Sequence, residues 1–118
     1  MESVTLVDAE NVRRSQWPNL SREELVRLVR LWAETTGQAA LVVFDGAPPD
    51  VESDGLVKVV GTDGESADDR IARDVERLVA DRRPYRLVTS DRALRERAGA
   101  EAEDLVGGGT FVRTLMAL

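Results

Sequence analysis

Apolar residues occur along this chain with two different periods. Short runs with the length and branched side chains of buried strands occupy residues 4–7, 40–44, 56–60 and 86–88. The segments between them carry apolar residues at the spacing of helices that bury one face. Strands and helices in this alternation predict an α/β protein, with helices on the faces of a parallel sheet.

Two long helices are predicted from their start signals. Ser21 and Glu24 have the spacing of a capping box, which predicts a helix over about residues 21–35 that ends at Gly37. A second helix should begin at Gly64 or Ser66. The apolar stripes are Leu25, Leu28, Val29 and Trp32 in the first helix, and Ile71, Val75, Leu78 and Val79 in the second.

The C-terminal third carries weaker signals. A short helix should follow the fourth strand and end near Ala98, residues 104–106 are expected to form a brief fifth strand, and residues 110–118 a last helix. The three glycines at 107–109 lack the lysine and hydroxyl residue of a phosphate-binding loop. A flexible turn is therefore predicted at these glycines.

The composition narrows the possible chemistry. The 118 residues, 42% of them hydrophobic, are expected to form one domain over residues 1–118. The absence of cysteine and histidine excludes thiolate nucleophiles, the Ser-His-Asp triad and most zinc sites. A net charge of −6 disfavours a sequence-independent nucleic-acid coat. No apolar stretch reaches the roughly 20 residues that span a bilayer, and no signal peptide is evident, so a soluble cytoplasmic protein without membrane association is expected.

Acidic residues gather where the predicted strands end. Asp8, Asp45 and Asp91 follow the first, second and fourth strands, and a further group follows the third strand at the start of a helix: Glu65, Asp68 and Asp69. Because parallel strands end at one edge of a sheet, these carboxylates should converge although they are far apart in sequence. Hard oxygen ligands suit Mg²⁺ or Mn²⁺, and such ions support phosphodiester hydrolysis without histidine.

Four segments, in order, resemble the motifs of NYN domains, the PIN-like nucleases that include the YacP-like branch. The sequence Leu-Val-Asp-Ala-Glu-Asn at residues 6–11 is similar to their D-x-x-N opening, and Val-Val-Phe-Asp at 42–45 to their second-strand motif. Glu-Ser-Ala-Asp-Asp at 65–69 resembles E-T-A-D, and Val-Thr-Ser-Asp at 88–91 resembles the segment after the fourth strand. The resemblance covers nearly the whole chain, from Val4 to about Leu115.

The resemblance implies a PIN-like three-layer α/β/α sandwich with a central, mainly parallel sheet, and metal-dependent endoribonuclease activity. By position, Asp8, Asp68 and Asp91 would be the principal metal carboxylates, with Glu65, Asp45 and Asp69 in support. Asn11 would orient a ligand or a phosphate. RNA, which a ribosome could present, is the expected partner, with Mg²⁺ or Mn²⁺ as cofactor, no nucleotide cofactor, and a monomer or weak dimer as the working form.

The sequence departs from the family in two respects. Glu10 stands where the YacP-like branch usually carries an aromatic residue, although other NYN members have an acid there. The chain is also shorter than many relatives, which leaves open how substrate reaches the site.

Several acids also have ordinary structural explanations. Asp45 precedes a turn, Asp91 has the position of a helix N-cap, and acids such as Asp68 and Asp69 are favourable in the first turn of a helix. One carboxylate can both cap a helix and bind a ligand, so neither role excludes the other.

RNA contacts are expected from residues beside the motifs. Arg13 and Arg14, assigned to the loop after the first strand, and Arg92 are candidates for phosphate contacts, and so is the Ser90 hydroxyl, although it could simply be a local cap. Trp17 could stack on a base or, as the preferred interpretation, pack near the start of the helix.

Two other functions fit parts of the pattern. The first is a non-cleaving NYN-fold module that binds RNA or a ribosome. The second is a receiver-like phosphoacceptor domain, which also gathers aspartates at strand ends. The second is disfavoured because Lys58, the only lysine, lies within a predicted strand rather than after a late one.

Overall fold

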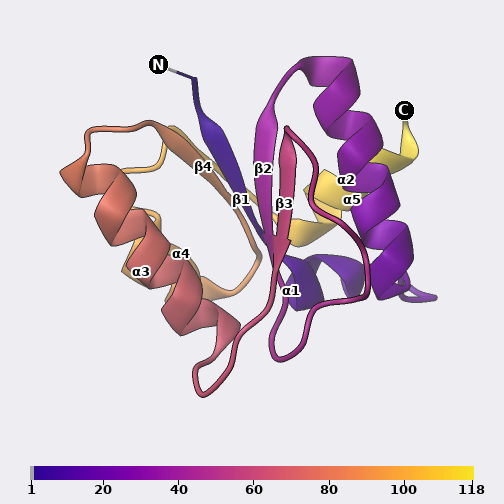
Figure 1. Cartoon of the computed structure of the whole chain (residues 1–118), viewed down its shortest axis with the longest axis horizontal. Helices are drawn as coiled ribbons and strands as arrows, with labels where there is room; N and C mark the ends of the chain where they lie inside the picture. Colours follow the sequence, from indigo (N-terminus) through magenta and orange to yellow (C-terminus); the bar gives the residue numbers. More distant parts are fainter. Residues whose placement is uncertain (1) are drawn as a thin grey trace.

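Five parallel strands form the central sheet of the computed structural model, which describes residues 2–118 (Figure 1). The strands are β1 (Val4–Asp8), β2 (Ala39–Val43), β3 (Val57–Val60), β4 (Tyr85–Val88) and β5 (Asp104–Val106). Their order across the sheet is β3-β2-β1-β4-β5. All five strands were predicted within a residue or so of their ends, and the sheet is parallel throughout.

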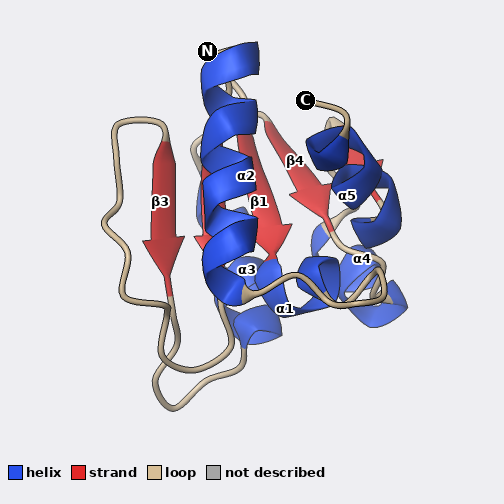
Figure 2. Cartoon of the chain, turned by 90° about the vertical axis from the view of Figure 1, so that its right-hand side faces the viewer, coloured by secondary structure: helices blue, strands red, loops and turns tan. Residues whose placement is uncertain are grey.

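Helices cover both faces of this sheet, which gives the three-layer sandwich that the sequence predicted (Figures 1 and 2). On one face, α1 (Ala9–Arg13), α2 (Arg22–Thr36) and α5 (Gly108–Met116) enclose a core with Val7, Val42 and Val88 of the sheet. On the other face, α3 (Ala67–Ala80) and α4 (Arg92–Ala98) pack over Leu6 and Leu87. Alternate residues of β1 thus enter opposite cores, as the pleat of a strand buried on both faces requires.

The strand order reverses beside β1. The chain passes from β1 to β2 and β3 on one side, and then crosses to β4 and β5 on the other. In open parallel sheets, ligands bind in the crevice outside the carboxyl ends of the strands at such a switch point. The fold therefore directs attention to the ends of β1 and β4.

Helix α2 begins and ends where its sequence signals indicate. The Ser21 hydroxyl accepts a hydrogen bond from the Glu24 amide at 3.0 Å, and Gly37 has a left-handed φ of 71° that favours glycine. The capping box is only half formed, because the Glu24 carboxylate pairs with Arg27. In the interior, Trp32 packs edge-to-face against Phe111, so its predicted place in the core is confirmed.

Three local predictions are wrong. Residues 9–13 form helix α1, so Arg13 lies in a helix and Arg14 caps it, where a loop was expected. The last helix begins at Gly108 and ends at Met116, so the glycines at 107–109 form its N-terminus rather than a flexible turn. Trp17 is 89% exposed and does not pack on the helix start. Among residues 2–118, no helix combines the length and the apolar composition that a membrane crossing requires.

Candidate active site

An open pocket of about 460 Å³ lies at the carboxyl edge of the sheet, at the switch point. Four aspartates from distant parts of the chain line it: Asp8, Asp45, Asp68 and Asp91. The pocket wall also contains Glu10, Asn11, Arg14, Ser15, Ser66 and Ala67. The convergence expected from the strand ends is thus present for four of the six acids.

Asp8 is the most buried acid of the pocket. It is the last residue of β1, only 5% exposed, and its Oδ2 accepts a hydrogen bond from the Thr89 hydroxyl at 2.8 Å. The pKa of this carboxyl is raised to about 6: burial raises it most, the negative charges of Asp68, Asp91 and Asp45 also raise it, and the Thr89 hydrogen bond lowers it. Asp8 therefore carries a charge that the fold itself only partly compensates.

Asp91 and Asp45 are oriented by helix N-termini. Asp91 Oδ1 accepts from the Leu94 amide at 3.0 Å and caps α4, as its position predicted. Asp45 Oδ1 accepts from the Ala67 amide at 3.1 Å, so the end of β2 is tied to the start of α3. Asp91 therefore has the N-cap role proposed for it as an alternative, whereas Asp45 bonds to the distant start of α3 and not within the turn that follows it. Both acids also line the shared pocket.

Asp68 and Asp69 are adjacent in sequence but point to different surroundings. Asp68 lines the pocket, and its pKa is raised by burial and by Asp91. Asp69 bonds to Arg97 of α4 at 2.6 Å, which lowers its pKa, and it does not line the pocket. Glu65 likewise lies outside and bonds to Arg73 at 2.9 Å. Glu65 and Asp69 are thus each balanced by an arginine, and the structure does not bring them into the cluster.

The four pocket aspartates have a donor set suited to a hydrated divalent cation. Asp8, Asp45 and Asp91 each use one carboxylate oxygen in the bonds described above, which orients the group and leaves its second oxygen for a ligand. Within residues 2–118, no group of three or more acidic side chains is arranged to hold a metal ion directly. Mg²⁺ is commonly bound through one or two carboxylates while it keeps several waters, and carboxylates of this pocket could hold an ion in that way.

Asn11 and Ser90 connect the pocket to the last helix. Asn11 Oδ1 accepts from the Ser90 amide at 2.8 Å, and the Ser90 hydroxyl accepts from the Gly108 amide at 2.8 Å. A Cβ at Gly108 would lie 2.8 Å from Asn11 Oδ1 and closer still to the Ser15 hydroxyl, so a larger residue there would displace these side chains. The Ser90 hydroxyl is therefore not the local cap that was the alternative, because it accepts its hydrogen bond from the first residue of the distant helix α5.

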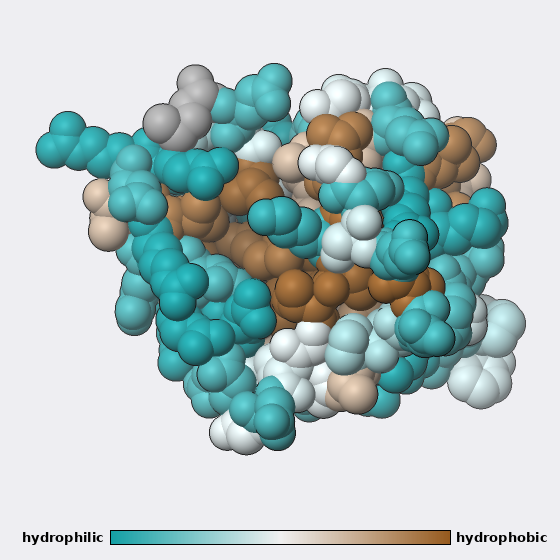
Figure 3. Space-filling model, in the orientation of Figure 1, coloured by the Kyte–Doolittle hydropathy of each residue, from teal (hydrophilic) through white to brown (hydrophobic). Residues whose placement is uncertain are grey.

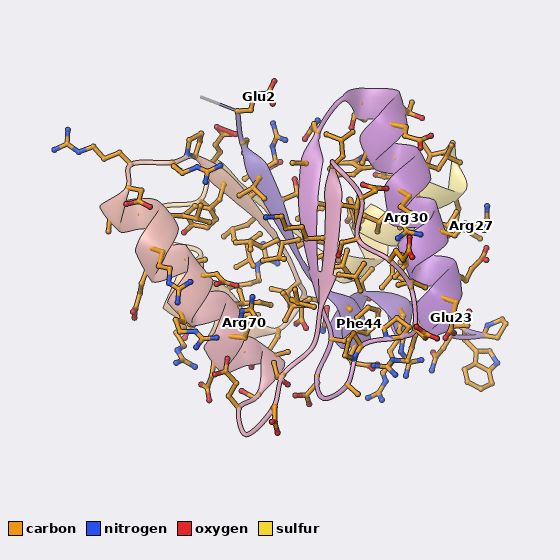
Figure 4. All side chains as sticks on the ribbon, in the orientation of Figure 1. Glu2, Glu23, Arg27, Arg30, Phe44 and Arg70 are labelled. Atoms are coloured by element: carbon orange, nitrogen blue, oxygen red, sulfur yellow. The ribbon has the colours of Figure 1, made fainter. Side chains whose placement is uncertain are left out.

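The arginines beside the first motif gather around Glu10. Its carboxylate lies 2.5 Å from Arg13, 3.6 Å from Arg14 and 3.5 Å from Arg22. The Arg22 guanidinium also lies 4.8 Å from the ring centre of Phe44, which Figure 4 labels. Arg13 is largely buried, with 18% of its side chain exposed, and so is poorly placed to meet RNA. Arg14 is 62% exposed and lines the pocket.

The two other RNA-contact candidates do not line the pocket. Arg92 is almost fully exposed at the start of α4, 3.9 Å from Glu96, and is not part of the pocket wall. Ser90 is exposed, but both its amide and its hydroxyl are engaged in the bonds to Asn11 and Gly108.

A second pocket of about 460 Å³ lies at the opposite end of the sheet. Its wall combines the apolar residues Val4, Leu6 and Leu41 with scattered charges of both signs, and apolar surface is visible between α3 and the strands in Figure 3. No four like charges gather there, which makes the carboxyl edge the better candidate for chemistry.

Sequence reasoning missed Glu10, Ser15 and Ser66 as members of the pocket wall. Glu10 was noted only as a departure from a motif, because five residues of α1 are too few to display a helical period. The sequence did contain a signal that Asp68, rather than Asp69, would face the interior. Asp68 precedes the buried Ile71 and Ala72 by three and four residues, which puts it on the inward face of α3.

Comparisons with known proteins agree with this geometry. The fold is similar to the crystal structure of Rae1 (YacP) from Bacillus subtilis, with a TM-score of 0.74 and 22% identity over 99% of this chain and 75% of that one. A point mutant of Rae1 matches with a TM-score of 0.77 and 22% identity, over 98% of this chain and 76% of that one. No curated protein matches the sequence significantly. Residues 6–114 match the model of the YacP-like NYN domain, and the chain therefore belongs to that family of PIN-like, nuclease-type domains.

Proposed function

We propose that this protein is a metal-dependent endoribonuclease that hydrolyses RNA phosphodiester bonds. The observation that supports this most directly is the convergence of four aspartates, from four separate segments, on one pocket at the carboxyl edge of the sheet. Membership of the YacP-like NYN family supports a nuclease-type activity. The absence of histidine and cysteine leaves carboxylates as the principal acid-base and metal-binding groups.

Asp8, Asp68 and Asp91 would hold Mg²⁺ or Mn²⁺, with Asp45 beside them. Such an ion lowers the pKa of bound water and stabilises charge on a phosphodiester in displacement. It would also neutralise the mutual repulsion that raises the pKa of Asp8 and Asp68. The same negative charges repel the phosphates of RNA when no cation is bound. Metal and RNA should therefore bind together.

The other side chains would position these groups. The Thr89 hydroxyl donates to Asp8 and accepts from the Asp91 amide at 3.0 Å, so it fixes the two carboxylates relative to one another. Asn11 holds the Ser90 segment, and Arg14 offers the pocket a partly exposed positive charge for a phosphate.

The test is cleavage of a mixed RNA pool in Mg²⁺ or Mn²⁺, against EDTA. Asp8→Asn and Asp68→Asn should each reduce cleavage by at least about 100-fold, since each removes a metal ligand. Asp69→Asn is the matched control, because it removes the neighbouring carboxylate, which faces Arg97 instead of the pocket. Equal loss in Asp68→Asn and Asp69→Asn, or cleavage that persists in EDTA, would exclude this function.

The second candidate is a module that binds RNA or a ribosome without cleavage. It is kept because, among residues 2–118, no three acids are arranged to hold a metal directly. RNA binding without any metal-dependent cleavage would indicate this candidate. Presentation of the substrate by a ribosome, and a cytoplasmic location, stay predictions.

A further inference from the structure

Trp17 is the most exposed large hydrophobic side chain among residues 2–118. It is 89% exposed, whereas the protein's other tryptophan, Trp32, is 7% exposed and packed on Phe111. Tryptophan is highly buried on average in folded proteins, so such exposure calls for an explanation. Its sequence neighbours include the polar Gln16 and Asn19, so it is not the centre of a continuous apolar run.

The loop that carries Trp17 is held at both ends. The Ser15 amide donates to the Val12 carbonyl, and the Leu20 amide donates to the Arg13 carbonyl, both at 3.0 Å. The Arg13 guanidinium also donates to the Leu20 carbonyl at 3.4 Å, and Leu20 is buried. The indole is therefore presented by a short anchored loop, and a ligand would lose little of its binding free energy in ordering it.

This loop begins in the wall of the carboxylate pocket. Arg14 and Ser15 both line the pocket, and Trp17 follows Ser15 by two residues, a Cα separation of roughly 7 Å at most. An exposed guanidinium in the pocket wall is thus followed, three residues along the chain, by an exposed indole. A positive charge for the backbone and an aromatic face for the bases are the two elements with which proteins hold single-stranded nucleic acid.

We propose that Trp17 is a stacking platform for a base of single-stranded RNA whose backbone passes Arg14 into the carboxylate pocket. The inference rests on the proposed function, which supplies RNA as the ligand. A duplex keeps its bases stacked on one another and offers the indole no free face, so the platform selects unpaired RNA. A protein partner is the less favoured occupant, since Trp17 belongs to no continuous apolar run of the sequence.

Intrinsic fluorescence provides a direct test, because Trp17 and Trp32 are the only tryptophans and only Trp17 meets solvent. The protein with Asp8→Asn, in Mg²⁺, is titrated with a short single-stranded RNA and with the same strand in a duplex. Single-stranded RNA should quench the exposed indole, and the duplex should quench it much less. RNA that binds by anisotropy without quenching Trp17 would overturn the platform.

Substitutions separate stacking from folding. Trp17→Ala should weaken single-stranded RNA binding about tenfold, the loss of one stacked base, and Trp17→Phe should recover most of the affinity. Both should melt like the parent, because the side chain is exposed, and Leu31→Ala, a partly exposed residue of α2, is the control for loss of an apolar surface group.

Cleavage by protein that keeps Asp8 separates the stacking platform from the proposed endoribonuclease function. A Trp17→Ala protein that cuts with raised KM and retained kcat supports the platform. Cleavage with unchanged KM would overturn the platform and leave the proposed function intact. Absence of both binding and cleavage in the unsubstituted protein would overturn the two together.

Discussion

Asp8→Asn should stabilise the metal-free protein at neutral pH. The pKa of Asp8 is about 6 in the fold against 3.8 for an ordinary aspartate. The folded state therefore binds this proton more tightly than the unfolded chain, and ionisation above pH 6 works against folding. At about 1.4 kcal/mol per pH unit of difference, the ionised group costs about 3 kcal/mol at pH 7. This penalty fades as the pH falls and is absent well below pH 4.

Asparagine has nearly the same shape, and its amide oxygen can still accept the Thr89 hydroxyl. In EDTA, urea unfolding at pH 7.5 should therefore give the variant up to about 3 kcal/mol more stability than the unsubstituted protein, and less than about 1 kcal/mol more at pH 4. The control is Asp69→Asn, whose carboxylate is exposed and paired with Arg97, and which should bring no gain. A variant that is less stable at pH 7.5, or that shows the same pH dependence as the unsubstituted protein, would refute the reasoning.

Three further outcomes are expected. Mn²⁺ should raise the melting temperature, because binding at a hundredfold excess over Kd adds about 2.7 kcal/mol to the free energy of unfolding. This gain should shrink in Asp8→Asn, and identical melting curves with Mn²⁺ and with EDTA would contradict a shared metal site. Thr89→Val removes a hydrogen bond that lowers the pKa of Asp8, so the acidic limb of the pH–activity profile should move to higher pH, while Thr89→Ser should keep it in place. Gly108→Ala should cost about 1–3 kcal/mol in thermal unfolding because its Cβ meets Asn11, whereas Gly109→Ala, with room around it, should be tolerated.

The long helices were predictable, because several apolar residues at helical spacing lie on the same buried face of each. The capping residue Ser21 marks the start of α2. Ser66 marks the start of α3, and the apolar stripe that includes Ile71 and Val75 marks its buried face. Helix α1 could not be found in the same way, since five residues do not complete two turns. The burial of Arg13 follows from its i,i+3 pairing with Glu10, which is visible only once that helix is known.

The site was predictable as far as topology determines it. Strand-end acids meet at one edge in any parallel sheet, which is why Asp8, Asp45 and Asp91 were grouped correctly. The outward turn of Asp69 and Glu65 depends on where Arg97 and Arg73 reach, and those contacts arise from packing between elements. The exposure of Trp17 likewise depends on a loop closed by backbone hydrogen bonds, which leave no pattern in the sequence.

The Ser90 junction makes the pocket and the C-terminal helix one thermodynamic unit. Its amide reaches Asn11 beside β1, and its hydroxyl satisfies the first free amide of α5 at Gly108. A ligand that tightens the pocket should therefore slow the local opening of α5, although no residue of that helix lines the pocket. Hydrogen exchange at the start of α5 becomes a remote report of site occupancy, and a truncation within that helix would loosen the floor of the pocket before it altered any carboxylate.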